Sequence, residues 1–197
     1  MTEGTGTMPL SRVHERFRVS CLPKAGLVAE EWGATHVVSL IDPALGAEHV
    51  PVIRNAEHIV ARLRDQETLE FTDHFPEIVE SLFETVRPAV ESPHSRILVH
   101  CHAGVSRSTA FCYTMIAHRA GRGMENEAFG AFLSIVNKPW PNRRIVEILD
   151  RKWQRDGALL KPLDAMRERY PNRIKAWDRY NIKRRFFELV PHEVYGR

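Results

Sequence analysis

The sequence predicts an α/β fold, with a mainly parallel central sheet of about four or five strands and helices on both faces. Apolar, strand-like runs alternate along the chain with longer segments of helical periodicity, an order typical of parallel sheets. The clearest pair is the aliphatic run 97–99 and the buried helical pattern of 109–117. In such a sheet a ligand site is expected at the edge where the strands have their carboxyl ends.

The other elements are predicted from the same periodicities. Strands are expected at residues 17–21, 35–42 and 58–64. Helices are expected at residues 27–32, 75–86, 124–136 and 145–153. Gly33 ends the first of these helices and Pro43 stops the second strand, as their backbone restrictions favour.

The length of 197 residues suits one domain. We expect that domain over residues 1–155, with a flexible start at 1–15 because this segment is polar and rich in Gly and Thr. No run approaches the roughly 20 apolar residues that span a bilayer. The three cysteines do not make a disulfide framework. The chain is therefore expected in the cytoplasm, without a membrane span.

Charge is unevenly distributed. Residues 151–197 contain 13 Lys or Arg and 6 Asp or Glu, a net charge of +7, whereas the whole chain carries +3. An anionic partner is one interpretation. No nucleic-acid motif accompanies these residues, and apolar side chains are interleaved with them, so we favour a solvated helical face and expect no nucleic-acid partner. The extension 156–197 is expected to pack on the domain through its aromatic residues.

A thiol and a guanidinium bracket the segment between the strand at 97–99 and its helix. Cys101 begins this short loop and Arg107 ends it, six positions later. Successive backbone N–H groups in such a loop can form a nest for an anion, and the N-terminus of the helix adds positive partial charge. The same field favours a thiolate at Cys101. Gly104 allows a tight turn, and the planar fork of Arg107 suits two oxygens of a phosphate.

The run His100 to Ser108 resembles the active-site signature of the cysteine-dependent protein tyrosine phosphatases, His-Cys-x5-Arg-Ser/Thr. Its Ala-Gly-Val-Ser-Arg-Ser portion is most similar to the dual-specificity branch. The resemblance covers roughly residues 15–155 and implies a metal-independent phosphatase that needs no cofactor, acts on phosphorylated proteins and forms a phosphocysteine on Cys101. Phosphotyrosine is the first expected substrate, with phosphoserine and phosphothreonine as further ones.

The resemblance also implies roles for the loop residues. Arg107 and the loop amides would bind the phosphate, Ser108 would hydrogen-bond the sulfur, and His100 would brace the loop. The phosphate-binding residues are then His102, Ala103, Gly104, Val105, Ser106 and Arg107. Asn142, in a Pro-Asn pair like the one before the family's last helix, is most simply a helix N-cap; bracing the phosphate loop is its weaker interpretation.

The general acid of this family is an Asp that follows a strand and precedes a helix. Asp65 matches that position and lies 36 residues before Cys101. Asp73 is the rival, although a helix cap is its simpler role. Glu67, in the same polar segment, is interpreted as a solvated charge.

Other functions remain open on sequence grounds. Lysines within the loop are typical of the family's lipid phosphatases and are missing here, which favours phosphoproteins over phosphoinositides. A phosphate-binding module without turnover would need a damaged Cys, Arg or acid. A thiol-based reductase or sulfurtransferase would need Cys21 or Cys112 to take part. Cys21 could also pair with Cys101 under oxidation, although a small buried side chain is its simpler interpretation. The substrate and the oligomeric state are left undetermined.

Overall fold

A fully parallel sheet of four strands forms the centre of the computed structural model, which describes residues 9–68, 74–183 and 185. The strands lie in the order β1-β4-β2-β3. Their bounds are β1 Phe17–Cys21, β2 His36–Ile41, β3 Glu57–Arg62 and β4 Ile97–Cys101. The expected α/β class and parallel sheet are confirmed.

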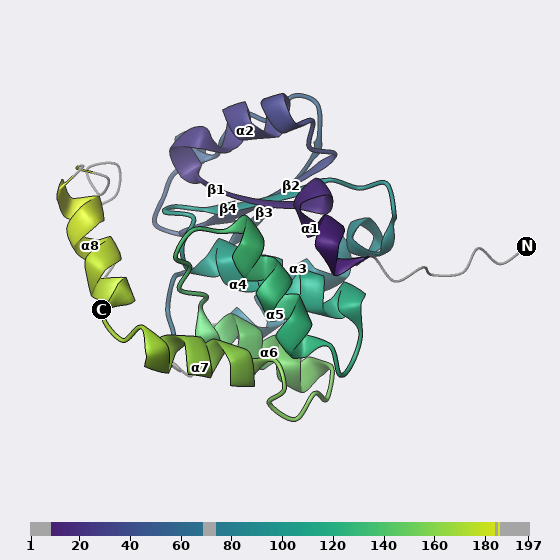
Figure 1. The fold of residues 1–197 in the computed structure, drawn as a ribbon. Coiled ribbons are helices and arrows are strands. Elements are labelled where there is room, and N and C mark those ends of the chain that lie inside the picture. The colour runs from purple at the N-terminus through teal and green to yellow at the C-terminus, as the bar shows by residue number, and fades with distance from the viewer. Residues whose placement is uncertain (1–8, 69–73, 184, 186–197) are drawn as a thin grey trace, which may run out of the picture.

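Helices cover both faces of this sheet, as Figure 1 shows: α2 lies on one face and α3 to α7 on the other. The helices are α1 Val13–Arg16, α2 Ala25–Trp32, α3 Phe75–Glu91, α4 Arg107–Ala120, α5 Glu125–Ile135, α6 Arg143–Lys152, α7 Leu160–Arg169 and α8 Arg173–Lys183. Short 3-10 turns occur at Leu10–Arg12, Leu22–Lys24 and Ala47–His49.

The central strand β4 explains why its sequence is an unbroken apolar run. All five of its residues are buried, because helices cover it on both sides. Leu98 packs toward α2 with Trp32, whereas Ile97 and Val99 join the larger core formed with α3 to α7. This burial fixes where β4 ends, and therefore the position of Cys101 at the carboxyl edge of the sheet.

The start of the described chain is ordered, contrary to the expectation of a flexible segment at 1–15. Residues 10–16 are helical, and Val13 is buried against the main core. The Gly- and Thr-rich composition behind that expectation belongs to residues 1–8, which lie outside the described part. Burial of the apolar Val13 side chain stabilises the helical conformation of residues 10–16.

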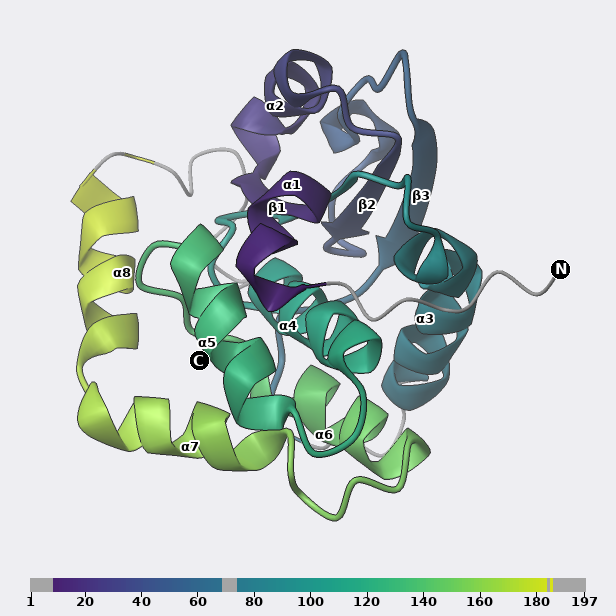
Figure 2. The same ribbon diagram turned by 45° about the vertical axis from the view of Figure 1, so that its right-hand side comes forward.

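The C-terminal extension contributes to the same core. Leu159, Leu163 and Met166 belong to the main cluster, and the carboxylate of Asp150 accepts hydrogen bonds from the backbone N–H groups of Gly157 and Leu159. Figure 2 shows α8 on the outside of the molecule, beside the loop between α5 and α6. Within the described ranges, no helix combines the length and apolarity that a membrane crossing requires.

Candidate active site

The candidate site lies where β4 passes into α4, at the carboxyl edge of the sheet. Cys101 is the last residue of β4 and Arg107 the first of α4, so five residues form the whole connection. Cys101 and Arg107 are each 1% exposed. The thiol and the guanidinium predicted from the sequence are therefore held at the two ends of one buried loop, which we call the phosphate loop (residues 101–107).

The carbonyl groups of the phosphate loop are bound by the surrounding protein. Those of His102, Val105 and Ser106 accept hydrogen bonds from the backbone N–H groups of Leu22 (2.9 Å), Trp140 (2.9 Å) and Asn142 (3.2 Å), respectively. The hydroxyl of Thr109 lies within hydrogen-bond distance of the carbonyl oxygens of both Val105 and Ser106, which share its one proton. In a trans peptide the N–H points opposite to the C=O. Carbonyls turned toward the protein therefore turn the following N–H groups the other way, as an anion nest requires.

The backbone of strand β1 leaves no room for a side chain at position 104, which explains the glycine there. Its φ of 71° lies in the left-handed region, and a Cβ there would approach the Ser20 carbonyl oxygen to 2.7 Å. The sequence predicted a tight turn at this residue; the close approach to a neighbouring backbone emerges only from the fold.

The reactive groups of the loop are fixed by short hydrogen bonds. The Sγ of Cys101 lies 3.1 Å from the Oγ of Ser108, which is fully buried. Arg107 donates from one terminal nitrogen to the Leu63 carbonyl at 2.6 Å. This contact ties the guanidinium to the end of the segment that carries Asp65.

Asp65 lies against the phosphate loop. Its Oδ1 accepts a hydrogen bond from the Oγ of Ser106 at 2.6 Å, and its Oδ2 is 3.9 Å from the Nε of Arg107. Ser106 is the N-cap residue of α4, yet its hydroxyl binds Asp65 and does not cap the helix. The rival acid, Asp73, lies outside the described residues, so the choice between the two stays a prediction.

Asn142 is the N-cap of α6, the simpler of the two roles expected for it, and its side chain also reaches the segment that carries Asp65. Its Oδ1 caps α6 by accepting from the N–H of Ile145 at 3.1 Å. Its Nδ2 donates to Asp65 Oδ1 at 3.0 Å and to the Gln66 carbonyl at 3.3 Å. Together with the bond from the Asn142 backbone N–H to the Ser106 carbonyl, these contacts join the acid segment, the phosphate loop and α6 at one buried residue.

Glu67 is exposed, as the sequence suggested, but its charge is paired. Both of its carboxylate oxygens accept from the guanidinium of Arg167 in α7, and the N–H of Arg143 donates to Oε1 at 2.9 Å. Arg167 also donates to the Pro141 carbonyl at 2.6 Å and stacks on Trp140. Sequence reasoning missed this link because its partners lie 100 residues apart.

His100 supports the loop from behind and is uncharged near neutral pH. Its Nε2 lies 2.5 Å from the Oγ of Ser39, and its Nδ1 lies 3.4 Å from the Cys101 carbonyl oxygen. Burial lowers the pKa of His100 to about 4. The same hydroxyl contacts His58, whose pKa is also lowered by burial. His102 is 3% exposed, and its carbonyl accepts from the N–H of Leu22, the residue that follows β1.

The two other thiols differ in position. Cys21 is the partner of Cys101 in the β1–β4 ladder and is partly buried. Cys112 is fully buried in α4, and this burial raises the pKa of its thiol far above the usual range. Cys112 is therefore held as an unreactive thiol, while Cys21 lies one strand away from the loop.

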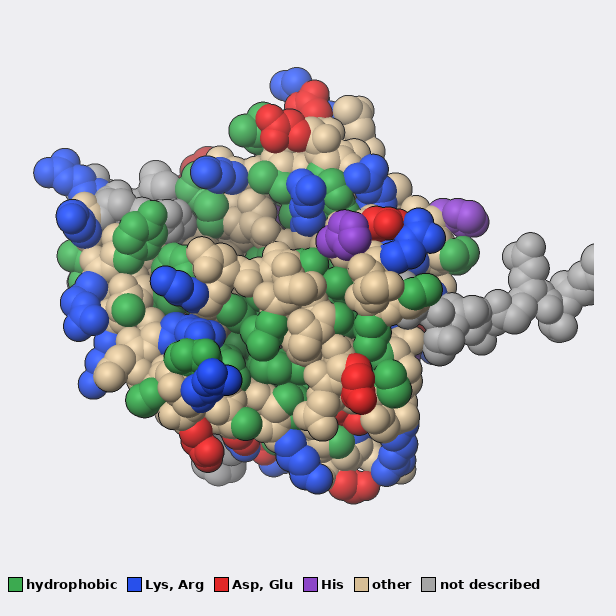
Figure 3. Space-filling view, viewed as in Figure 1, with side chains coloured by type: hydrophobic (Ala, Val, Ile, Leu, Met, Phe, Trp, Pro, Cys, Tyr) green, Lys and Arg blue, Asp and Glu red, His purple; other side chains and the backbone are tan. Residues whose placement is uncertain are grey.

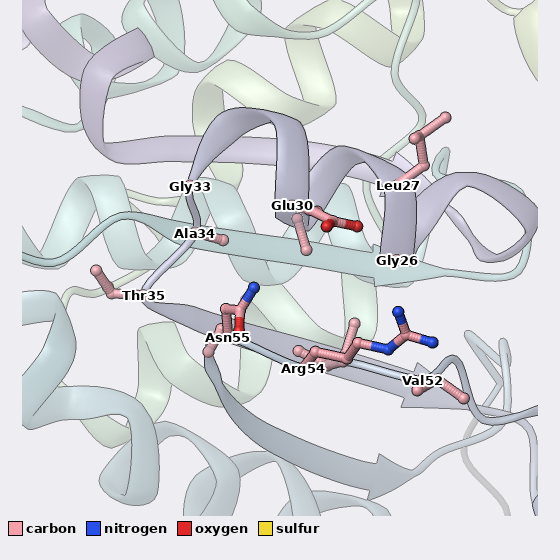
Figure 4. A pocket seen from close by; sticks show the side chains of 12 residues that line it. Gly26, Leu27, Glu30, Gly33, Ala34, Thr35, Val52, Arg54 and Asn55 are labelled. Atoms are coloured by element: carbon pink, nitrogen blue, oxygen red, sulfur yellow. The ribbon is translucent and has the colours of Figure 1, made fainter.

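A separate pocket of about 600 Å³ lies on the opposite face of the sheet, between α2 and the segment before β3. Figure 4 shows Glu30 on the α2 side and Arg54 and Asn55 on the other. None of its lining residues belongs to the phosphate loop. In the residues that the structure describes, no group of three or more His, Cys, Asp or Glu side chains could hold a metal ion.

Comparison with known proteins gives one family match and several matches of fold. The family model of protein-tyrosine phosphatases matches residues 64–138, whereas no curated protein matches the chain. Among solved structures, human DUSP28 is similar with a TM-score of 0.56 and 19% identity, over 75% of this chain and 97% of that one. A mouse putative dual specificity phosphatase complexed with zinc tungstate has a TM-score of 0.55 and 20% identity, over 80% of this chain and 96% of that one. The human tyrosine phosphatase-like serine/threonine/tyrosine-interacting protein has a TM-score of 0.52 and 19% identity, over 70% of this chain and 91% of that one.

Proposed function

The family match and the fold support a cysteine-dependent phosphatase similar to the dual-specificity branch of the protein tyrosine phosphatases, and we propose that it hydrolyses phosphomonoesters on proteins, with phosphotyrosine as its main substrate. One observation carries this proposal: a thiol, a guanidinium and a carboxylate from two distant segments meet at one loop. Cys101, Arg107 and Asp65 supply these three groups.

In the first step the Cys101 thiolate attacks phosphorus, the phosphorus–oxygen bond to the leaving group breaks, and a phosphocysteine forms. Arg107 and the inward N–H groups of the phosphate loop would bind the equatorial oxygens, where negative charge sits in the transition state. A guanidinium and backbone dipoles supply the positive charge, so this step needs no metal ion. Asp65 would give its proton to the leaving oxygen.

In the second step a water molecule attacks phosphorus and the phosphorus–sulfur bond breaks. Asp65, now ionised, would accept the proton of that water. The hydroxyl of Ser108, 3.1 Å from the sulfur, is placed to donate a hydrogen bond to the departing thiolate. Phosphate then leaves, and both groups return to their starting protonation states.

The covalent step is tested by replacing Cys101 with Ser. Serine does not ionise near neutral pH, so turnover of a small aryl phosphate should fall below a few per cent of the parent. Binding of tungstate, a tetrahedral oxyanion, should remain measurable because Arg107 and the loop amides are unchanged. Binding is read by calorimetry and turnover by phosphate release. Substantial turnover by Cys101→Ser would contradict the phosphocysteine mechanism.

The substrate class is tested with a panel of phosphotyrosine peptides, phosphoserine peptides and phosphoinositides, run without added metal. We expect the highest kcat/KM on phosphotyrosine peptides. A preference of about tenfold or more for phosphoinositides would instead assign the chain to lipid phosphate hydrolysis, with the same loop chemistry.

A further inference from the structure

A pocket of about 310 Å³ lies outside the site described above, between the start of the α5–α6 loop and helix α8. Figure 2 shows α8 beside this loop. Two of the lining side chains are cations and two are aromatic. The full lining is Asn137, Lys138, Arg173, Ala176, Trp177 and Tyr180.

Specific contacts build this pocket. The indole Nε1 of Trp177 donates to the Lys138 carbonyl at 2.7 Å, and Arg173 donates to the Pro139 carbonyl at 3.3 Å. Lys138 has a φ of 48°, in the left-handed region that residues with a Cβ rarely adopt. Such backbone conformations persist only where the surroundings hold them, and they cluster at functional sites.

The two cations have no carboxylate partner among the described residues. Arg173 contacts the Pro139 carbonyl, the Met166 sulfur and the ring of Tyr170, and Lys138 forms no ion pair within the described chain. Helix α8 carries four basic residues and a single acidic one, Asp178. Figure 3 shows Lys and Arg side chains gathered along this edge of the molecule. The electrostatic field over the pocket therefore favours an anionic group.

The pocket is coupled to the phosphate loop through one short segment. The N–H of Trp140, two residues after Lys138, donates to the Val105 carbonyl at 2.9 Å. Two residues span at most about 7 Å, so the backbone of Lys138 lies within roughly 10 Å of the Val105 carbonyl. An extended peptide rises about 3.3 Å per residue, and its side chains about two to four positions from the phosphorylated residue reach this distance.

We propose that this pocket binds an acidic side chain of the substrate protein, near the phosphorylated residue. Lys138 and Arg173 pair with the carboxylate, and Trp177 and Tyr180 contact its apolar stem. A concave site with two cations and two aromatic walls suits one such side chain. The inference rests on the proposed phosphatase function and names a specificity determinant that lies in the C-terminal extension.

The test compares two phosphotyrosine peptides of otherwise identical sequence. One carries Glu and the other Gln at the positions two to four residues before and after the phosphotyrosine. The parent protein should favour the Glu peptide by about fivefold or more in kcat/KM, mainly through KM. Lys138→Gln should lower this Glu/Gln ratio about fivefold, the upper range for one partly exposed ion pair. Lys138→Arg should keep the ratio, and salt should reduce it in the parent.

Lys175→Gln is the matched control, because Lys175 is an exposed cation of helix α8 that does not line the pocket. It should leave the Glu/Gln ratio unchanged. A merely structural role of Lys138 would lower the rates on both peptides and keep their ratio. Equal losses of the ratio in Lys138→Gln and Lys175→Gln would also overturn the pocket, in favour of a diffuse field.

Failure of this inference is distinguishable from failure of the proposed function. A parent protein that hydrolyses both peptides with a ratio near one overturns only the pocket. A parent that hydrolyses neither peptide nor a small aryl phosphate overturns the phosphatase itself. A Lys138-dependent preference for phosphoinositide vesicles, with no such dependence on peptides, would assign the pocket to a lipid headgroup and overturn the proposal as well.

Discussion

Among the single residues, Arg107 combines a structural and a chemical role. Its guanidinium is fixed by the Leu63 carbonyl and lies beside Asp65. Arg107→Lys keeps the charge but loses the planar fork that matches two phosphate oxygens. We expect kcat to fall by about 10² or more, the scale for losing a preorganised oxyanion donor. Steady-state kinetics on an aryl phosphate measure this, and near-parent activity would exclude the proposed binding of phosphate.

Asp65 can be tested through the leaving group it would protonate. A phenolate of low pKa leaves unaided, whereas a tyrosine side chain, with a pKa of about 10, needs a proton. Asp65→Asn should slow a phosphotyrosine peptide by about 10²-fold, the usual scale for general acid catalysis, and a nitrophenyl phosphate much less. Asparagine keeps the acceptor for Ser106 and Asn142, so the loop geometry is preserved.

Asp73→Asn is the control for this substitution, because it removes the carboxyl group of the rival acid and leaves Asp65 unchanged. We expect this substitution to leave the hydrolysis rates of both substrates nearly unchanged. The reverse pattern between the two variants would make Asp73 the acid. An equal loss on both substrates with Asp65→Asn would indicate a structural role.

At the scale of secondary-structure elements, helix α7 holds the acid segment in place. Arg167 binds both oxygens of Glu67, two residues after Asp65, and also binds the Pro141 carbonyl. An element of the extension therefore positions a candidate catalytic residue of the domain. This is the physical reason to treat α7 as part of the structural unit that carries the candidate site.

The α7 link predicts a selective kinetic defect. Arg167→Gln should lower kcat on a phosphotyrosine peptide by about tenfold, since small misplacements of a catalytic group are costly, and should affect nitrophenyl phosphate less. Glu67→Gln should behave alike, and the double variant should lose little more than either one, because the two side chains form one contact. Arg169→Gln, an exposed residue of the same helix, is the control. If the losses in kcat of the two single variants add up in the double variant, Arg167 and Glu67 do not act through their mutual contact, which would contradict this prediction.

For the molecule as a whole, buried His100 makes stability depend on pH. Burial lowers the pKa of His100 to about 4, whereas an unfolded histidine has a pKa of about 6.5. The unfolded chain thus binds more protons between these values, and the free energy of unfolding falls as the pH falls through this window. Acidification from pH 7 to pH 5 should cost about 2 kcal/mol from this group.

Urea unfolding between pH 5 and pH 7 measures this dependence. His100→Gln should be less stable than the parent at pH 7, because the contacts to Ser39 and the Cys101 backbone change. Its free energy of unfolding should nevertheless fall less steeply with acid, since the titrating group is gone. Parallel pH profiles for parent and variant would mean that His100 is not the source of the slope.

Local pattern was enough to predict the parts of the site that are contiguous in sequence. The apolar run of β4, the loop from Cys101 to Arg107 and the helix after it are determined by neighbouring residues, because strand burial, turn and helix start follow one another directly. The α/β class followed from the same periodicities. Asp65 was located from the order of strand, loop and helix together with the family resemblance, and its role as the acid remains a prediction.

Tertiary structure decided the contacts between distant segments. Asn142 reaches Asp65 across 77 residues and Arg167 reaches Glu67 across 100, and no periodicity encodes which side chains meet over such separations. The order of residues 10–16 also depends on a partner, since Val13 gains its burial from a core assembled elsewhere. Local sequence sets the loop from Cys101 to Arg107, whereas the contacts of the extension with Glu67 and with residues 138–141 set part of its surroundings, because only the folded chain brings those surfaces together.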